Sequence, residues 1–274
     1  MTPPKFDRIC GIPNLGFGTF PLRGDKAVNA VNTAIDLGIR HIDTAQMYGN
    51  EQDVGRAIKQ SGVARNEFFL VTKVDPSNIG QGRFSESVAK SVDVLSGPVD
   101  LLLIHWPPEA KDLEPALDRL MREKQIGTTR EIGVSNFSAP MLRRSYVYTG
   151  GAIINNQVEF HPLLDQHELQ ATASELGIAL SAYCPLARGA ALKLKIVQDV
   201  AHRLGRQPAE VVLRWIIQQG IVAIPMSTKR HNIESNLNAL SFELSVQDMA
   251  AISAIGTRQG RLINPGWMTG RWDS

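Results

Sequence analysis

The sequence predicts an α/β protein, a (β/α)8 TIM barrel formed as a single domain over residues 1–274. Short β-branched and aliphatic segments alternate with amphipathic helical segments about eight times, and no linker or low-complexity segment interrupts them. A length of 274 residues is also usual for one such barrel. A doubly wound open sheet is the competing fold, but a closed barrel is the simpler interpretation of eight repeats.

Eight segments are predicted to be strands. Several are continuous apolar runs, which is typical of parallel strands covered on both faces. The predicted strands are Asn14–Thr19, Arg40–Asp43, Phe68–Lys73, Asp100–His105, Arg130–Ser135, Ile153–Val158, Ala179–Tyr183 and Val222–Pro225.

Helices are predicted between the strands from apolar periodicity and end signals. Lys26–Leu37 places its apolar residues on one face, and Gly38 follows as a C-terminal stop. Asp165 and Glu168 form a capping-box pattern at the start of a helix over Asp165–Leu176. Two later helices are predicted over Pro208–Gln219 and, capped by Ser245, over Val246–Ile255.

Composition and charge narrow the class of protein. A net charge of +2 gives no reason to expect a nucleic-acid or membrane partner, and no apolar run approaches the roughly 20 residues of a membrane helix. The N-terminus lacks the apolar core of a signal peptide. Two cysteines are too few for a disulfide framework, and the histidines show no metal-ligand spacing. We expect a cytoplasmic monomer that binds no metal and acts on a small molecule.

Polar and aromatic residues follow the predicted strands, where a (β/α)8 barrel builds its active site. Asp43 and Tyr48 follow the second strand, Lys73 ends the third and His105 ends the fourth. A neighbouring ammonium lowers the pKa of a tyrosine towards working pH, and a carboxylate holds that ammonium in place. A histidine can donate a hydrogen bond to a developing alkoxide. These four residues predict an acid–base site.

Four segments, in order along the chain, resemble the aldo-keto reductases: HIDTAQMYGNE at 41–51, LLIHWP at 102–107, REIGVSNF at 130–137 and IP at 224–225. The resemblance implies that a nicotinamide cofactor donates a hydride to a carbonyl and Tyr48 donates the proton. It implies a catalytic tetrad of Asp43, Tyr48, Lys73 and His105. The chain most resembles short bacterial members that reduce methylglyoxal or diketogluconate, so we expect small aldehyde, ketone or keto-sugar substrates.

The resemblance also implies binding residues. Ser135, Asn136 and Gln157 would hold the nicotinamide carboxamide, and Tyr183 would stack on the ring. The substrate would contact Tyr48, His105, Trp106 and Trp267, with residues 261–274 as a substrate-covering tail. The expected cofactor residues are Gly18, Thr19, Phe20, Asp43, Ser135, Asn136, Gln157, Tyr183, Pro185, Leu186, Pro225, Ser227, Thr228, Lys229, Arg230 and Asn236.

One departure from the family pattern concerns the cofactor. Many members have a lysine directly after the Ile-Pro pair and an arginine six residues later, both on the 2′-phosphate of NADPH. Here these places hold Met226 and Asn232. The nearby run Ser227–Arg230 offers two hydroxyls and two cations, which can satisfy a phosphate. We expect NADPH rather than NADH, with Arg230 favoured over Lys229 as the phosphate contact.

Two other functions stay open. A nucleotide-sensing binding subunit would share the cofactor residues, although it need not keep Tyr48 and Lys73 together. A sugar isomerase or aldolase can share the fold, with Lys73 as a Schiff-base lysine. Nucleophilic catalysis fits poorly, because no Gly-x-Ser-x-Gly surrounds Ser135 and Cys184 has no obvious partner.

Overall fold

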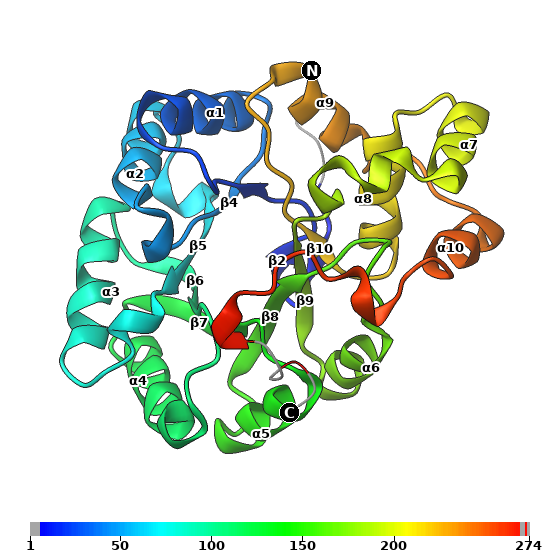
Figure 1. Cartoon of the computed structure of the whole chain (residues 1–274). Helices are drawn as coiled ribbons and strands as arrows, with labels where there is room; N and C mark the ends of the chain where they lie inside the picture. Colours follow the sequence, from blue (N-terminus) through cyan, green and yellow to red (C-terminus); the bar gives the residue numbers. More distant parts are fainter. Residues whose placement is uncertain (1–5, 269–271, 273–274) are drawn as a thin grey trace.

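The computed structural model describes residues 6–268 and 272, and its centre is a sheet of eight parallel strands ringed by helices (Figure 1). The strands follow the order β10-β9-β8-β7-β6-β5-β4-β3. The two edges of this sheet meet, because Leu15 bridges Ala223 in parallel and the Gly16 N–H donates to the Ala223 carbonyl at 2.8 Å. The predicted barrel class is confirmed.

The eight strands fall on the eight predicted segments. The first and last shorten to two residues each, and Pro225 gives a reason for the last, since proline has no N–H to continue a ladder. The two edges also approach closely, because a Cβ on Gly18 would lie 3.2 Å from Cγ2 of Ile224. The strands are β3 Phe17–Gly18, β4 His41–Asp43, β5 Phe69–Val74, β6 Val99–Ile104, β7 Thr129–Ser135, β8 Ile153–Glu159, β9 Ala179–Tyr183 and β10 Val222–Ala223.

A short N-terminal hairpin, β1 Arg8–Ile9 and β2 Ile12–Pro13, was not predicted. Its turn, Cys10-Gly11, has positive φ at both residues, 48° and 82°. Ile12 packs inside the barrel with apolar side chains of β5, β6, β9 and β10. The hairpin precedes β3 directly, so it closes the N-terminal end of the barrel and leaves the opposite end for polar side chains.

In the described part of the chain, α-helices surround the strands (Figure 1). They are α1 Gly24–Asp36, α2 Glu51–Gln60, α3 Arg83–Val94, α4 Leu113–Gln125, α5 Ala139–Tyr148, α6 His167–Leu176, α7 Lys195–Leu204, α8 Pro208–Gln218, α9 Arg230–Asn238 and α10 Val246–Ser253. Short 3-10 helices are η1 Gln46–Tyr48, η2 Arg65–Glu67, η3 Pro76–Asn78, η4 Ala110–Asp112, η5 Ala187–Gly189, η6 Ala191–Lys193, η7 Arg258–Gly260 and η8 Gly266–Met268. Among the described residues, none of these helices is long and apolar enough to cross a bilayer.

The predicted capping box of Asp165 and Glu168 is wrong. The helix α6 begins two residues later, at His167, and the Asp165 carboxylate accepts the His167 N–H at 3.0 Å in a turn that precedes the helix. An aspartate side chain can accept a hydrogen bond from the backbone N–H two residues later in a turn, as well as cap a helix, and this explains the error. The predicted cap of α10 is confirmed, because Ser245 accepts the Asp248 N–H at 3.1 Å.

Candidate active site

The predicted tetrad residues meet at the C-terminal ends of β4, β5 and β6. The buried Nζ of Lys73 donates to Oδ1 of Asp43 at 2.6 Å and to the Thr44 carbonyl at 2.8 Å. It also donates to the hydroxyl oxygen of Tyr48 at 3.2 Å. The His105 ring stands edge-on to the Tyr48 ring, with 5.5 Å between centroids. Adjacent parallel strands thus assemble one polar cluster from residues far apart in sequence.

Lys73 stays an ammonium in this cluster. Burial alone would lower the pKa of Lys73, but Asp43 and Tyr48 together outweigh burial and keep the pKa above its ordinary value. The three hydrogen bonds of Nζ also use all three donors of an ammonium group. The neutral amine that a Schiff base requires is therefore disfavoured.

Tyr48 keeps its proton at neutral pH. Burial raises the pKa of Tyr48 above its ordinary value of 10.0, and the neighbouring Lys73 lowers the pKa without cancelling that effect. The lowering expected from Lys73 is present, but the net shift has the opposite sign because burial disfavours a phenolate. The side chain is therefore a phenol beside a cation, and such a cation favours the phenolate that a proton transfer from Tyr48 would leave.

His105 is neutral. Burial, followed by the charge of Lys73, holds the pKa of His105 well below its ordinary value. Its Nδ1 is buried and has no hydrogen-bond partner among the described residues, while the ring lines a cavity. The other ring nitrogen, Nε2, is therefore the one available to a ligand in that cavity.

A hydrogen-bonded layer from β7, β8 and β9 supports the cluster. The Gln157 amide donates to Oδ2 of Asp43 at 2.7 Å, and the Ser135 hydroxyl donates to the Gln157 carbonyl at 2.8 Å. The Tyr183 hydroxyl donates to Oδ1 of Asn136 at 2.7 Å. The Asn136 backbone is left-handed at φ 65°, a region that asparagine tolerates better than most residues. The residues expected to hold a carboxamide thus lie side by side.

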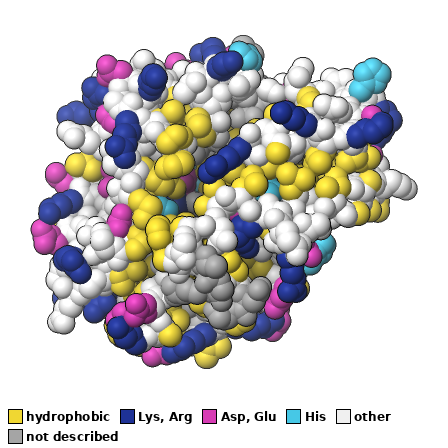
Figure 2. Space-filling model, viewed as in Figure 1, with side chains coloured by type: hydrophobic (Ala, Val, Ile, Leu, Met, Phe, Trp, Pro, Cys, Tyr) yellow, Lys and Arg dark blue, Asp and Glu magenta, His cyan; other side chains and the backbone are white. Residues whose placement is uncertain are grey.

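A cavity of about 570 Å³ opens above these residues, within the range of small-molecule sites. Hydrophobic side chains gather around the hollow in the middle of this face (Figure 2). Fourteen predicted site residues line the cavity: Gly18, Thr19, Phe20, Asp43, Tyr48, His105, Trp106, Ser135, Asn136, Gln157, Tyr183, Pro185, Leu186 and Pro225.

Seven further lining residues were not predicted: Pro21, Met47, Cys184, Arg188, Ile224, Met226 and Ile263. Most are apolar, and only Met47 and Ile224 fall within the segments that resemble the family. Arg188 is exposed at the rim, in a left-handed conformation at φ 52°. The only signal in the sequence that could have identified Arg188 is its positive charge shortly after Tyr183, Pro185 and Leu186, which were expected to bind the cofactor.

Five expected cofactor residues lie outside this lining, in the loop after β10 and in α9: Ser227, Thr228, Lys229, Arg230 and Asn236. The Ser227 hydroxyl accepts the Lys229 N–H and the Asn232 amide, each at 3.1 Å. Arg230 pairs with Glu234 at 3.1 Å, both largely exposed. Asn236 is buried. The loop is compact, with its cations at the surface.

The two tryptophans expected on the substrate side lie together. The Trp106 ring stacks on His105 with 6.2 Å between centroids, and the Trp267 ring meets Trp106 edge-on at 6.2 Å. Trp267 itself is 60% exposed and does not line the cavity. Of the predicted tail, residues 269–271, 273 and 274 lie outside the described part of the chain.

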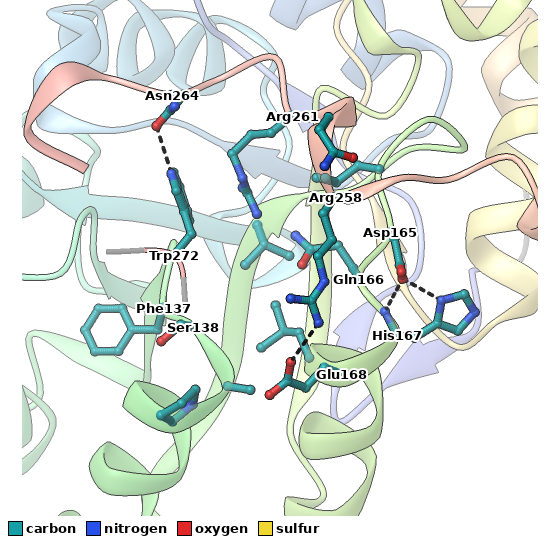
Figure 3. A pocket seen from close by; sticks show the side chains of 16 residues that line it. Phe137, Ser138, Asp165, Gln166, His167, Glu168, Arg258, Arg261, Asn264 and Trp272 are labelled. Atoms are coloured by element: carbon teal, nitrogen blue, oxygen red, sulfur yellow. Dashed lines mark hydrogen bonds and ion pairs between the residues drawn. The ribbon is translucent and has the colours of Figure 1, made fainter. Parts of the chain in front are cut away.

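A second cavity of about 750 Å³ lies on the other side of the C-terminal segment, between it and the first turns of α5 and α6 (Figure 3). Trp272 lines it and donates from Nε1 to Oδ1 of Asn264 at 2.8 Å. Two of its lining residues, Arg258 and Glu168, form an ion pair with 3.9 Å between Nη2 and Oε2. The guanidinium of Arg261 lies 3.7 Å from the centroid of the Trp272 ring. These contacts join the segment to itself and to α6.

Comparison with known proteins places this site in a family. Residues 14–257 match the model of the Aldo/keto reductase family. Methylglyoxal reductase DkgB of Escherichia coli O157:H7 is 40% identical over 96% of this chain and 99% of its own. A crystal structure provisionally named 2,5-diketo-D-gluconic acid reductase B has a TM-score of 0.93 and 36% identity, covering 97% of this chain and 95% of that one. A mutant of Gox0644 in complex with NADPH has a TM-score of 0.87 and 32% identity over 92% and 93%.

Proposed function

Because the chain belongs to the aldo/keto reductase family, we propose that it reduces small aldehydes and ketones to alcohols, with NADPH as the hydride donor. The observation that carries the proposal is the contact of the Lys73 ammonium with the Tyr48 hydroxyl at 3.2 Å. It joins a protonated phenol to a cation at the floor of a cavity large enough for a small molecule.

The proposed proton path uses three residues. The carbonyl oxygen accepts hydrogen bonds from the Tyr48 hydroxyl and from Nε2 of His105. A bound nicotinamide would supply the hydride to the carbonyl carbon, and Tyr48 would give its proton to the carbonyl oxygen, so that the alcohol forms. Lys73 stabilises the phenolate that remains, and a proton from solvent restores the phenol. Such a general acid contributes about 10²–10⁴-fold.

The described residues fit a nicotinamide dinucleotide. Ser135, Asn136 and Gln157 present uncharged amide and hydroxyl groups, which suit a carboxamide. Tyr183 offers an aromatic face beside them, and Arg188 stands as a cation at the rim. Tyr48, His105 and Trp106 are then left on the same floor for the carbonyl substrate.

Two alternatives are less well supported. A Schiff-base isomerase or aldolase needs a neutral lysine amine, whereas Asp43 and Tyr48 keep the pKa of Lys73 high. A nucleotide sensor has no use for the close packing of Tyr48, Lys73 and His105.

The test is absorbance of reduced nicotinamide in the presence of purified protein. We expect NADPH oxidation with methylglyoxal, and a panel of aldehydes, ketones and 2,5-diketo-D-gluconate would order the substrates. Equal and negligible rates with every carbonyl and both cofactors would exclude the reductase proposal.

The loop after β10 yields a prediction on cofactor choice. Lys229 and Arg230 are exposed, so either can turn towards a 2′-phosphate, and Arg230 offers the better fork for phosphate oxygens. Replacing both with alanine should weaken NADPH by about ten- to a hundredfold, since a hydrogen bond to a charged group contributes roughly 1.5–3 kcal/mol. NADH, which lacks the phosphate, should bind as before. Fluorescence titration of both single variants and the double variant checks this. Unchanged NADPH affinity in the double variant would exclude the loop as the binding site of the 2′-phosphate.

A further inference from the structure

The C-terminal strap, defined as residues 261–268, forms a wall between the two cavities. Ile263 lines the cavity above Tyr48, whereas Arg261 and Asn264 line the second cavity (Figure 3). The Trp267 ring of the strap packs against Trp106. The strap therefore shapes the substrate side of the catalytic cavity rather than the cofactor side.

One buried carboxylate holds this strap. Glu159, at the end of β8, is 0% exposed. Its Oε1 accepts the Leu262 N–H at 2.8 Å, and its Oε2 accepts the Ile263 N–H at 2.9 Å, across more than 100 residues of sequence. His161 contributes a third hydrogen bond at 2.9 Å.

The carboxylate is charged at neutral pH. Burial alone would raise the pKa of Glu159, but hydrogen bonds from His161, Leu262 and Ile263 outweigh burial and place the pKa below its ordinary value. Hydrogen bonds to a charged acceptor are roughly twice as strong as those between neutral groups. The two hydrogen bonds from Glu159 to the strap are thus stronger than two ordinary hydrogen bonds between backbone groups.

The same strand end also holds the acid–base cluster. Gln157 lies two residues before Glu159, so both side chains project from the same side of β8. Gln157 donates to Asp43, which holds Lys73. The end of β8 therefore fixes the polar floor of the cavity through one residue and its outer wall through the other.

We propose that Glu159 is a positioning residue that holds the strap at the carbonyl subsite, so that loosening its grip raises KM for the carbonyl without weakening NADPH. This rests on the proposed reductase function. No strap residue belongs to the expected cofactor set, so KM for the carbonyl should change while the Kd of NADPH does not. The strap acts on the reaction through the space it leaves beside Trp106.

Two variants weaken the hydrogen bonds between Glu159 and the strap, one by changing the acceptor and one by removing a donor. Glu159→Gln keeps the shape of the side chain but replaces one acceptor oxygen with an amide that cannot accept. Leu262→Pro removes one donor N–H from the strap and leaves β8 intact. The preceding Arg261, at φ −64° and ψ 125°, already has the backbone conformation that a proline requires before it. Leu262→Ala is the matched control, because it trims an exposed side chain and keeps the N–H.

We expect KM for methylglyoxal to rise about tenfold or more in Glu159→Gln and Leu262→Pro, with the Kd of NADPH within about twofold of wild type. Leu262→Ala should stay near wild type in both. Hydrogen exchange at the Ile263 amide should quicken in Glu159→Gln, while amides of β5 and β6 stay protected. If Glu159→Gln does not fold, the proline and alanine variants decide.

Equal KM values in the proline and alanine variants would overturn the proposal, as would unchanged exchange at Ile263 in Glu159→Gln. A wild-type protein that reduces no carbonyl would instead refute the proposed function. In that case the exchange measurement still shows whether Glu159 holds the strap, so the two failures are distinguishable.

Discussion

Replacing Tyr48 with phenylalanine is expected to lower kcat for carbonyl reduction by about 10²–10⁴-fold, the usual contribution of a general acid. The phenol keeps its proton at neutral pH and accepts a hydrogen bond from Lys73, so we expect its hydroxyl to be the proton source and the cation to stabilise the phenolate that remains. Steady-state turnover of methylglyoxal measures the loss. A decrease well under a hundredfold would contradict the role of Tyr48.

Tyr183→Phe is the matched control, because it removes a hydroxyl from the same cavity. That hydroxyl donates to Asn136 at 2.7 Å rather than to the Lys73 cluster. We expect Tyr183→Phe to weaken NADPH while kcat at saturating cofactor changes far less than in Tyr48→Phe. In Tyr48→Phe itself, NADPH affinity should survive, since the phenol belongs to the carbonyl side.

Replacing Lys73 with methionine is expected to lower kcat and to move the alkaline limit of the pH–rate profile upwards. The proposed reaction requires protonated Tyr48, and Lys73 lowers the pKa of that phenol. Removing the cation therefore raises the pKa of Tyr48, so activity is lost at a higher pH than in wild type. The residual rate measured across alkaline pH gives the shift. An unchanged profile, together with a borohydride-trapped adduct at Lys73 of the wild type, would support Schiff-base chemistry.

The same substitution should destabilise the fold. Lys73 and Asp43 form a buried ion pair at 2.6 Å, and removing one partner leaves an uncompensated carboxylate. Breaking such a pair typically costs about 3–5 kcal/mol. Chemical denaturation measures this loss, and Asp43→Asn with Lys73→Met should recover part of it. NADPH titration of each variant separates lost catalysis from lost folding.

The sequence by itself determined the eight strands and the polar residues that follow them, whereas the closure of the sheet between Leu15 and Ala223 was decided by the tertiary structure. Continuous apolar runs such as β6 can only be buried on both faces, and each ends in a polar residue where a barrel places its site. This local rule was enough to nominate Asp43, Lys73 and His105, which the structure brings together with Tyr48. It was not enough for helix starts, because Asp165 can satisfy either a turn or a cap.

The direction of the Tyr48 pKa was decided by the tertiary structure. Sequence reasoning supplied the neighbouring cation and so a lowering. Burial opposes that lowering and outweighs it, and the depth of burial is a sum over many packed neighbours that no motif records.

The lining of the cavity and the hold on the strap were likewise decided only in three dimensions. Arg188 and Ile263 reach the cavity from η5 and from the C-terminal segment, and neither belongs to a motif. Glu159 is recognisable in sequence only as a polar residue at a strand end. Its partners are backbone N–H groups more than 100 residues away, and every residue except proline carries such a group. Side-chain chemistry can be deduced from the order of residues, whereas a contact with the backbone depends on where the chain returns.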